Sequence, residues 1–225
     1  MSTLRPGAEH IGVHALVAVK DLARAKTRLS AEFSAPDRER LVLAMLADTL
    51  YAAREVSAIA SITVVTPDDA VADLALDAGA DVFPEPHANS GRTDDLLNSA
   101  LTHAAAHLRA AVGPVDLLAL QADLPALRPA ELDAAVASTP LGRSIVVDHR
   151  DTGTAALFHR DPESDLDPQF GGASGRRHIA TGAVALAGEW PGLRLDVDTS
   201  DDLRRAVALG VGAATTKTLD HIGWN

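Results

Sequence analysis

The chain has 225 residues and a formal net charge of −11, with 47% apolar residues, 3% aromatic residues and no cysteine. This length suits one large domain with its own core, and the lack of cysteine excludes disulfides, thiolate metal ligands and cysteine nucleophiles. The acidic balance argues against DNA or RNA as a partner, because nucleic acids are bound by broad basic surfaces. No apolar run approaches ~20 residues, the length of a membrane span, and residues 1–12 lack the apolar centre of a secretory signal. We therefore expect a cytoplasmic protein that binds neither nucleic acid nor membrane.

Short apolar runs alternate with helical patterns along the chain. Strands are predicted at 13–19, 62–65, 81–83, 117–120, 144–147, 155–158 and 193–197, and helices at 35–56, 94–112 and 199–210. The last helix opens with Thr199 and Asp202 in capping-box spacing and closes on Gly210. This alternation predicts a single-domain α/β fold with a mostly parallel, Rossmann-like sheet flanked by helices. We place the domain at 13–213, between an N-terminal tail at 1–12 and a C-terminal tail at 214–225.

Polar residues follow the apolar runs, where a parallel sheet binds its ligand. Lys20 follows the first run, Thr66-Pro67-Asp68 follows the second, and the sequence QADLP at 121–125 follows the fourth. The sequence DTGT lies beside the next pair of strands, and DVDT ends the last predicted strand. We expect these segments to converge on one site.

Two of the three lysines of the chain, Lys20 and Lys26, follow the first predicted strand, together with Arg24 and Arg28. A loop between a first strand and a first helix can wrap a triphosphate, with amide N–H groups and lysines neutralising the oxygens. The spacing matches neither a Walker A loop nor a GxGxxG motif. A solvated basic helix face is the alternative, but the scarcity of lysine in the chain favours phosphate binding.

Carboxylates end two of the predicted strands. Asp123 follows the run LLAL, and Asp196 and Asp198 flank Val197, so that on a strand both would point the same way. Mg²⁺ prefers one or two carboxylates together with phosphate oxygens and water. Asp198 alone would suit helix capping and Asp123 alone a turn, but their combination favours a metal site.

The sequences DTGTAAL and FGGASGRRH supply a third group of polar residues. Gly171, Gly172 and Ser174 form a glycine-rich turn before a helix that we expect to begin near Arg176, a pattern suited to an anion. A flexible surface loop is the alternative for the glycine-rich segment, and Thr154 could equally be an ordinary strand residue. No GxSxG elbow is present, which favours a reaction whose nucleophile arrives with the substrate. The histidines outside this segment have no ligand spacing, and we interpret them as structural or exposed.

The motifs AVKDLARAKTRLS, VVTPD, QADLPAL, DTGTAAL, FGGASGRRH and LRLDVDTSDDL occur in an order that resembles the phosphoenolpyruvate and 2-phospho-L-lactate guanylyltransferases of coenzyme F420 biosynthesis. The resemblance spans about 13–212 and is strongest to the actinobacterial branch. It implies a nucleotidyltransferase-type α/β fold, GTP as co-substrate, Mg²⁺ as cofactor, and phosphoenolpyruvate as acceptor. It also implies a downstream transferase of the same pathway as a partner; the oligomeric state stays open.

The resemblance also implies roles for individual residues. The catalytic residues would be Lys20, Lys26 and Asp123, and the metal ligands Asp123, Asp196 and Asp198. The acceptor would contact Thr154, Gly171 and Ser174. The GTP phosphates would face Lys20, Lys26 and Arg28, and guanosine would contact Thr66, Pro67, Leu97 and Asn98. Two positions depart from the family pattern, Ala122 where a glycine is expected and Gly172 where a proline is frequent.

The predicted reaction is the attack of a phosphate oxygen of phosphoenolpyruvate on the α-phosphorus of GTP, with pyrophosphate as leaving group. The same chemistry on 2-phospho-L-lactate or 3-phosphoglycerate is an alternative. Three other functions are alternative hypotheses: a molybdenum-cofactor guanylyltransferase, a metal-dependent glycosyltransferase and a non-catalytic nucleotide-binding module. The absence of a GxGxR loop disfavours the first of these, and the lysines disfavour the second.

Overall fold

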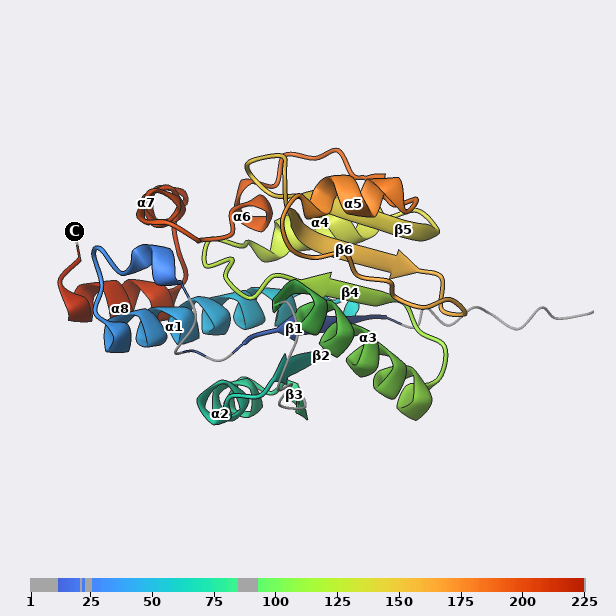
Figure 1. Cartoon of the computed structure of the whole chain (residues 1–225), viewed down its shortest axis with the longest axis horizontal. Helices are drawn as coiled ribbons and strands as arrows, with labels where there is room; N and C mark the ends of the chain where they lie inside the picture. The colour runs from blue at the N-terminus through green and yellow to red at the C-terminus, as the bar shows by residue number, and fades with distance from the viewer. Residues whose placement is uncertain (1–11, 21, 23–25, 85–92, 225) are drawn as a thin grey trace, which may run out of the picture.

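A seven-stranded sheet with the strand order β3-β2-β1-β4-β6-β5-β7 runs through the computed structural model of the chain (Figure 1). The structure describes residues 12–20, 22, 26–84 and 93–224. The strands are β1 (Val13–Ala18), β2 (Ile59–Thr66), β3 (Asp81–Pro84), β4 (Leu117–Leu120), β5 (Gly142–Val147), β6 (Thr154–Arg160) and β7 (Val184–Ala185). The helices are α1 (Ala35–Arg54), α2 (Asp69–Asp77), α3 (Thr93–Val112), α4 (Pro129–Ala137), α5 (Ser174–Ala180), α6 (Pro191–Arg194), α7 (Ser200–Leu209) and α8 (Ala213–Ile222), and a 3₁₀ turn, η2, spans Thr27–Leu29.

The sheet is mixed but mostly parallel, which confirms the predicted α/β class. Strand β1 pairs in parallel with β2 and β4, and β2 pairs in parallel with β3. Strand β6 lies antiparallel between β4 and β5, and β5 pairs in parallel with the short edge strand β7. The carboxyl ends of β1, β2 and β4 therefore open at the same edge of the sheet, which is where the polar segments were expected to meet.

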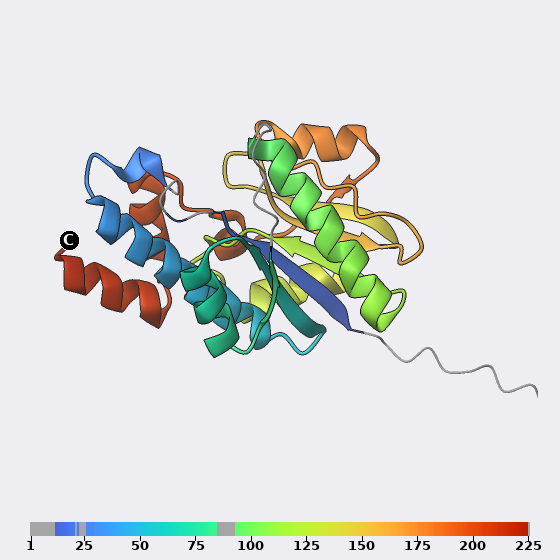
Figure 2. The same cartoon turned by 60° about the horizontal axis from the view of Figure 1, so that its bottom comes forward.

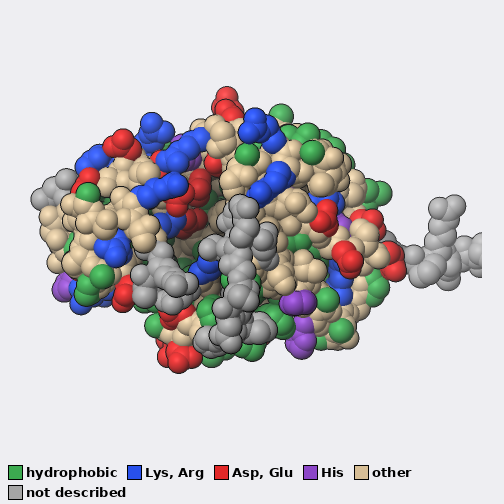
Figure 3. All heavy atoms as spheres, viewed as in Figure 1, with side chains coloured by type: hydrophobic (Ala, Val, Ile, Leu, Met, Phe, Trp, Pro, Cys, Tyr) green, Lys and Arg blue, Asp and Glu red, His purple; other side chains and the backbone are tan. Residues whose placement is uncertain are grey.

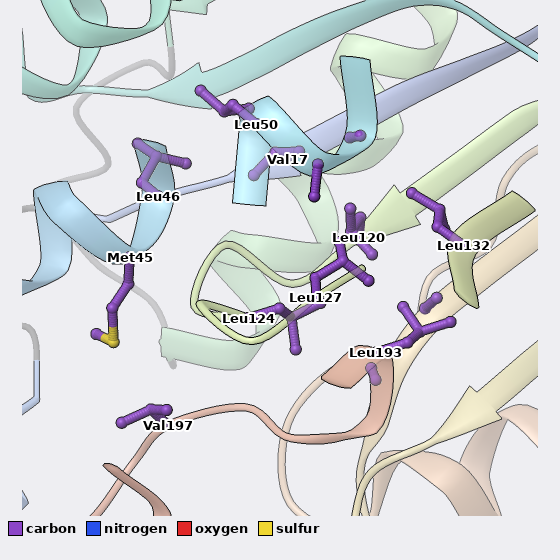
Figure 4. Close-up of a cluster of buried hydrophobic side chains, with 14 of the residues drawn as sticks. Val17, Met45, Leu46, Leu50, Leu120, Leu124, Leu127, Leu132, Leu193 and Val197 are labelled. Atoms are coloured by element: carbon purple, nitrogen blue, oxygen red, sulfur yellow. The ribbon is translucent and has the colours of Figure 1, made fainter. Parts of the chain in front are cut away.

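Helices cover both faces of the sheet (Figures 1 and 2). Alternate residues of β1 divide between the two cores: Val17 faces a cluster with α1, α4 and α6, whereas Leu16 packs with residues of α3. Figure 4 shows the first cluster, in which Leu46 of α1, Leu120 of β4 and Leu193 of α6 lie together with their neighbours. The core is aliphatic, as the low aromatic content of the chain requires.

The predicted strand at 193–197 is wrong. Residues Pro191–Arg194 form the short helix α6, and the chain then runs extended without joining the sheet. Leu193, Leu195 and Val197 are all buried, so the alternating pattern reports burial correctly. Their backbone partners lie elsewhere, because Leu193 N donates to Glu131 Oε2 (2.8 Å) and Val197 N donates to the Asp123 carbonyl (3.1 Å).

The segment at 214–225, expected as a C-terminal tail, contains most of α8, which packs against α1. Asp48 of α1 accepts the backbone N–H groups of Ala214 (3.0 Å) and Thr215 (2.9 Å) and so caps the first turn of α8. The expected tail at 1–12 lies almost wholly outside the described residues. In the part of the chain that the structure describes, we find no helix with the length and apolar character of a membrane span.

Beyond α8, the indole of Trp224 rests on the segment that follows η2. Its ring centroid lies 6.0 Å from that of Phe33, and its Nε1 donates to Glu32 Oε2 at 3.0 Å. Arg204 of α7 lies over the same ring, 5.9 Å from the centroid, and donates to Glu32 Oε1 at 3.0 Å. Trp224 and Arg204 therefore hold the segment that follows η2, a few residues after Lys26 and Arg28.

Candidate active site

A charged site lies beyond the carboxyl ends of β1 and β4. On the face shown in Figure 3, acidic side chains gather in a hollow whose rim carries Lys and Arg side chains. Lys26 donates to Asp123 and, at 2.8 Å, to Asp198 Oδ1, although these residues are far apart in the sequence. Arg28 approaches Asp198 Oδ2 at 3.7 Å from the exposed side. The structure thus joins the predicted basic loop to two of the three predicted metal ligands.

Lys26 is held in an unusual position. Its side chain is only 11% exposed, and its backbone lies in the left-handed region with φ 51° at the start of η2, which costs energy in a residue other than glycine. Burial alone would lower the pKa of Lys26, but the Asp123 and Asp198 carboxylates raise it above its usual value. The ammonium group is therefore charged, and a solvated basic helix face does not describe it.

The turn that carries Asp123 is fixed from α1. The Oγ1 atom of Thr49, a fully buried residue, accepts the backbone N–H of Leu124 at 3.1 Å and itself donates to the Met45 carbonyl at 2.8 Å. The side chain of Leu124 is buried in the same core cluster as Val197 and lies next to Leu127 in Figure 4. The hydrogen bond from Val197 N to the Asp123 carbonyl then places the Asp196–Asp198 segment alongside this turn.

Asp198 is not the cap of α7. The capping box of that helix is formed by Thr199 and Asp202, as the sequence predicts. Burial opposes ionisation of Asp198, but the charge and hydrogen bond of Lys26 lower its pKa below the ordinary value. The carboxylate of Asp198 therefore does not cap the helix, and its lowered pKa keeps it ionised.

Asp196 lies deeper than Asp198, with its side chain 20% exposed. Burial raises its pKa to about 7, and the nearby negative charges of Asp123 and Asp198 act in the same direction. His149 Nδ1 lies 3.5 Å from Asp196 Oδ1, and its Nε2 lies 3.0 Å from Asp202 Oδ1. A carboxylate in this environment favours a positive partner.

The residues present fit a divalent cation between Asp123, Asp196 and Asp198. The Oδ1 atoms of Asp123 and Asp196 are buried and accept no hydrogen bond from the described residues. The ammonium of Lys26 already stands as a cation against Asp123 and Asp198. Among the residues that the structure describes, no three acidic or histidine side chains are grouped closely enough to hold a metal ion.

The three predicted acceptor residues belong to two neighbouring segments. Thr154 begins β6 and is buried, and Ser174 begins α5, where its N–H donates to the Gly171 carbonyl at 3.1 Å. Gly171 has φ 122° and Ala173 φ 56°, so the turn uses two residues in the left-handed region. Helix α5 begins at Ser174, two residues earlier than predicted from the sequence.

The start of α5 is docked on the loop before Thr154. The N–H of Gly175 donates to the Thr152 carbonyl at 3.1 Å. A Cβ atom at Gly175 would lie 2.9 Å from the Gly153 carbonyl oxygen, a contact that excludes any larger residue. The two predicted acceptor segments are therefore brought together.

The predicted guanosine contacts lie at the end of β2 and at the start of α3. Thr66 ends β2, and its Oγ1 accepts the N–H of Asp68 at 3.2 Å, while Pro67 is half-buried between them. Leu97 lines a small cleft with Ala18, Gln121 and Phe170. Asn98 uses its amide to pair with the backbone of Phe170, as described below. Lys20 is half-buried just past the end of β1, whereas Arg24 lies outside the described residues.

Comparison with known proteins identifies the family. The family model described as "Guanylyl transferase CofC like" matches residues 13–225. The chain belongs to this family.

Close relatives in the CofC-like family share most of their length with the chain. A phosphoenolpyruvate guanylyltransferase of Nocardia farcinica is 59% identical over 99% of this chain and 95% of its own length. A second, from Mycolicibacterium paratuberculosis, is 49% identical over 97% of this chain and 99% of its own length.

Solved structures share the fold at low identity. A Desulfovibrio desulfuricans protein is 16% identical with a TM-score of 0.62, covering 93% of this chain and 95% of its own. A nucleotidyl transferase from Methanothermobacter is 18% identical with a TM-score of 0.58, covering 88% of this chain and 98% of its own. These likenesses confirm the nucleotidyltransferase-type fold expected from the sequence.

Several residues of this CofC-like site escaped the sequence analysis. Thr49 lies in the middle of an amphipathic helix, and nothing in its neighbourhood marks it as the support of a distant turn. The sequence predicts only a structural or exposed role for His149, yet it lies between Asp196 and Asp202. Asp68 was seen only as part of a strand-end motif, but it caps α2 and accepts the N–H of Leu22 at 3.1 Å. These contacts join segments that are far apart in the chain, so no local pattern reports them.

Proposed function

We propose that the chain transfers the guanylyl group of GTP to phosphoenolpyruvate, giving enolpyruvyl-diphospho-5'-guanosine and pyrophosphate, in coenzyme F420 biosynthesis. The observation that carries this proposal is the 59% identity, over nearly the full length of both chains, to a protein named phosphoenolpyruvate guanylyltransferase. The convergence of Lys26, Asp123, Asp196 and Asp198 in one hollow supports it.

A phosphate oxygen of phosphoenolpyruvate forms the new bond to the α-phosphorus of GTP, and the bond from that phosphorus to the β-phosphate bridging oxygen breaks. The attacking phosphate monoester has a second pKa near ~6 and is already ionised at neutral pH, so no side chain has to accept its proton. The work of the protein is to position two polyanions in line and to offset their charge.

Asp123, Asp196 and Asp198 would hold Mg²⁺, which when bound offsets the charge that develops on the transferring phosphoryl group. Lys20, Lys26 and Arg28 would contact the triphosphate, with Lys26 exchanging its carboxylate partners for phosphate oxygens. Thr66, Pro67 and Leu97 would border the guanosine, together with the start of α3 at Asn98. Thr154, Gly171 and Ser174 would bind the acceptor.

The proposal is tested with purified protein, GTP, Mg²⁺ and one acceptor at a time. Phosphoenolpyruvate, 2-phospho-L-lactate and 3-phosphoglycerate are compared by pyrophosphate release and by the mass of the product. We expect the highest kcat/KM with phosphoenolpyruvate and no turnover in the presence of a metal chelator. Preference for another acceptor would overturn the substrate assignment, and no release with any acceptor would favour a non-catalytic nucleotide-binding protein.

The Asp123→Asn variant tests the site within the same assay. It keeps the size of the side chain but removes the charge that faces Lys26, and we expect kcat to fall by at least ~100-fold. Asp133→Asn on the exposed face of α4 is the matched control. Equal kcat values for the two variants would refute the role of Asp123.

A further inference from the structure

One fully buried side chain, that of His178 in α5, touches both segments of the proposed acceptor site. Its Nδ1 atom lies 3.0 Å from Thr154 Oγ1, and its Nε2 atom lies 2.9 Å from the backbone nitrogen of Gln169. The imidazole therefore bridges the first residue of β6 and the segment that leads into Gly171.

The geometry fixes which ring nitrogen carries the hydrogen. A backbone N–H can only donate, so the Nε2 atom of His178 must accept from Gln169 and is unprotonated. Burial lowers the pKa of His178 to about 4, so the ring is neutral at pH 7 and its hydrogen is on Nδ1. Nδ1 then donates to Thr154 Oγ1, and the hydroxyl hydrogen of Thr154 is left to point at another acceptor.

Further contacts hold the same two segments. The ring of Phe170 meets that of His178 edge to face at 5.3 Å. Asn98 of α3 pairs with Phe170 through both backbone groups, since its Oδ1 accepts from Phe170 N at 2.8 Å and its Nδ2 donates to Phe170 O at 3.0 Å. Gln121, two residues before Asp123, donates to the Thr154 carbonyl at 3.1 Å.

We propose that His178 is a positioning residue for the phosphorylated acceptor, which sets the distance between Thr154 and the 169–171 segment and orients the Thr154 hydroxyl as a hydrogen-bond donor. This inference rests on the proposed function, because it takes Thr154, Gly171 and Ser174 as the acceptor site. His178 makes no direct contact with substrate in this proposal. A donor hydroxyl suits an anionic ligand, which offers only oxygen acceptors.

Two variants each remove one half of the bridge. In His178→Gln the side-chain oxygen reaches the place of Nε2 and still accepts from Gln169, but the bond to Thr154 is lost. In His178→Asn the side-chain nitrogen takes the place of Nδ1 and still donates to Thr154, but the bond to Gln169 is lost. We expect each variant to raise KM for phosphoenolpyruvate about tenfold, the effect of one lost buried hydrogen bond, with KM for GTP unchanged.

A double-mutant cycle separates positioning from general loss of packing. If His178 acts through Thr154, the Thr154→Val/His178→Gln double variant has the same KM for phosphoenolpyruvate as Thr154→Val alone. His159→Gln is the matched control, because His159 is equally buried and bonds through both ring nitrogens to Ser164 and Arg109. His159 lies five residues after Thr154 along β6, about 17 Å from it. We expect His159→Gln to lower the unfolding midpoint without changing the KM for phosphoenolpyruvate or for GTP.

The tautomer is measured in the wild-type protein, which keeps the proposal testable even where a variant folds poorly. Long-range ¹H–¹⁵N spectra should show His178 as a neutral ring with hydrogen on Nδ1. A ring with hydrogen on Nε2 would overturn the proposal, as would additive effects in the cycle or equal changes in both KM values. Wild-type turnover with phosphoenolpyruvate is measured first, because its absence refutes the proposed function, whereas normal turnover with unchanged KM in the variants refutes only the role of His178.

Discussion

At the scale of single residues, the candidate site brings three carboxylates together, and their mutual repulsion destabilises the folded protein when no metal is bound. Asp123, Asp196 and Asp198 share one hollow, and the one described ammonium that bridges two of them leaves Asp196 with a pKa raised to about 7. A raised carboxyl pKa means that the folded state binds its proton more tightly than the unfolded state does. The stability that Asp196 contributes is therefore complete below pH ~4 and is lost as the pH rises through about 7.

We predict that the Asp196→Asn variant is more stable than the wild type at pH 8 in the absence of metal. A carboxyl pKa raised to about 7 corresponds to roughly 2–4 kcal/mol in the free energy of unfolding at pH 8. The stability difference between the two proteins should shrink at pH 5, where the wild-type carboxyl is protonated. Thermal unfolding in chelator at both pH values measures it, and turnover should be lost in the same variant. The exposed Asp133→Asn variant is the control, and an equal pH dependence of the two variants would contradict the prediction.

At the scale of elements, the sequence located almost every strand because the apolar runs of a parallel sheet are short and nearly continuous. Strand β4 was predicted with its exact bounds, and α7 with its capping box and its terminal Gly210. The strand prediction for 193–197 is wrong because alternation of apolar residues reports burial, whereas a strand also needs a neighbouring strand to share its backbone hydrogen bonds. In the structure Asp196 and Asp198 nevertheless lie beside Asp123, because the backbone N–H of Val197 donates to the Asp123 carbonyl.

What the sequence could not provide was the set of contacts that tie one element to another. Thr49 supports the Asp123 turn from α1, and Asn98 pairs with Phe170 from α3. Both residues have ordinary neighbours in the chain, and the contacts exist only once the sheet has brought the helices together. Asn98 is predicted from the sequence as a guanosine contact, but its pairing with Phe170, like the support from Thr49, is visible only in three dimensions.

Helix α8 provides a prediction at the same scale. Its first turn is capped by Asp48, whose two carboxylate oxygens each accept one backbone N–H. Asp48→Asn places an amide group against one of these N–H groups, and we expect a loss of roughly 1–3 kcal/mol in the free energy of unfolding. Urea unfolding measures it against Asp73→Asn, an exposed position within α2. Equal unfolding free energies for the two variants would show that Asp48 does not hold α8.

At the scale of the whole molecule, a chain of net charge −11 has to bind two further polyanions. On the face shown in Figure 3, Lys and Arg side chains lie around the hollow, and we expect the carboxylates within it to attract a divalent cation. GTP and Mg²⁺ should therefore bind together far better than either binds alone.

We predict that Mg²⁺ with GTP at about 100 times its Kd stabilises the fold by ~2.7 kcal/mol, which raises Tm by about 5–10 °C for a domain of this size. GTP in chelator and Mg²⁺ alone should give much smaller shifts, measured by thermal unfolding. Mg²⁺ with ATP tests recognition of the base, and Asp123→Asn tests the carboxylates. A full shift from GTP in chelator would refute the coupling between nucleotide and metal.

The contact of Trp224 with the segment that follows η2 has an optical consequence. The chain has two tryptophans, and Trp190 is buried in the core whereas Trp224 lies against Phe33, Glu32 and Arg204. Consecutive backbone hydrogen bonds from Leu29 to Lys26 and from Phe33 to Leu29 connect that indole to the lysine in two short turns. We expect the proposed exchange of Lys26 from its carboxylates to a triphosphate to change the surroundings, and so the emission, of Trp224. Stopped-flow fluorescence without any attached dye would measure this response to nucleotide binding, and unchanged emission on addition of GTP and Mg²⁺ would contradict it.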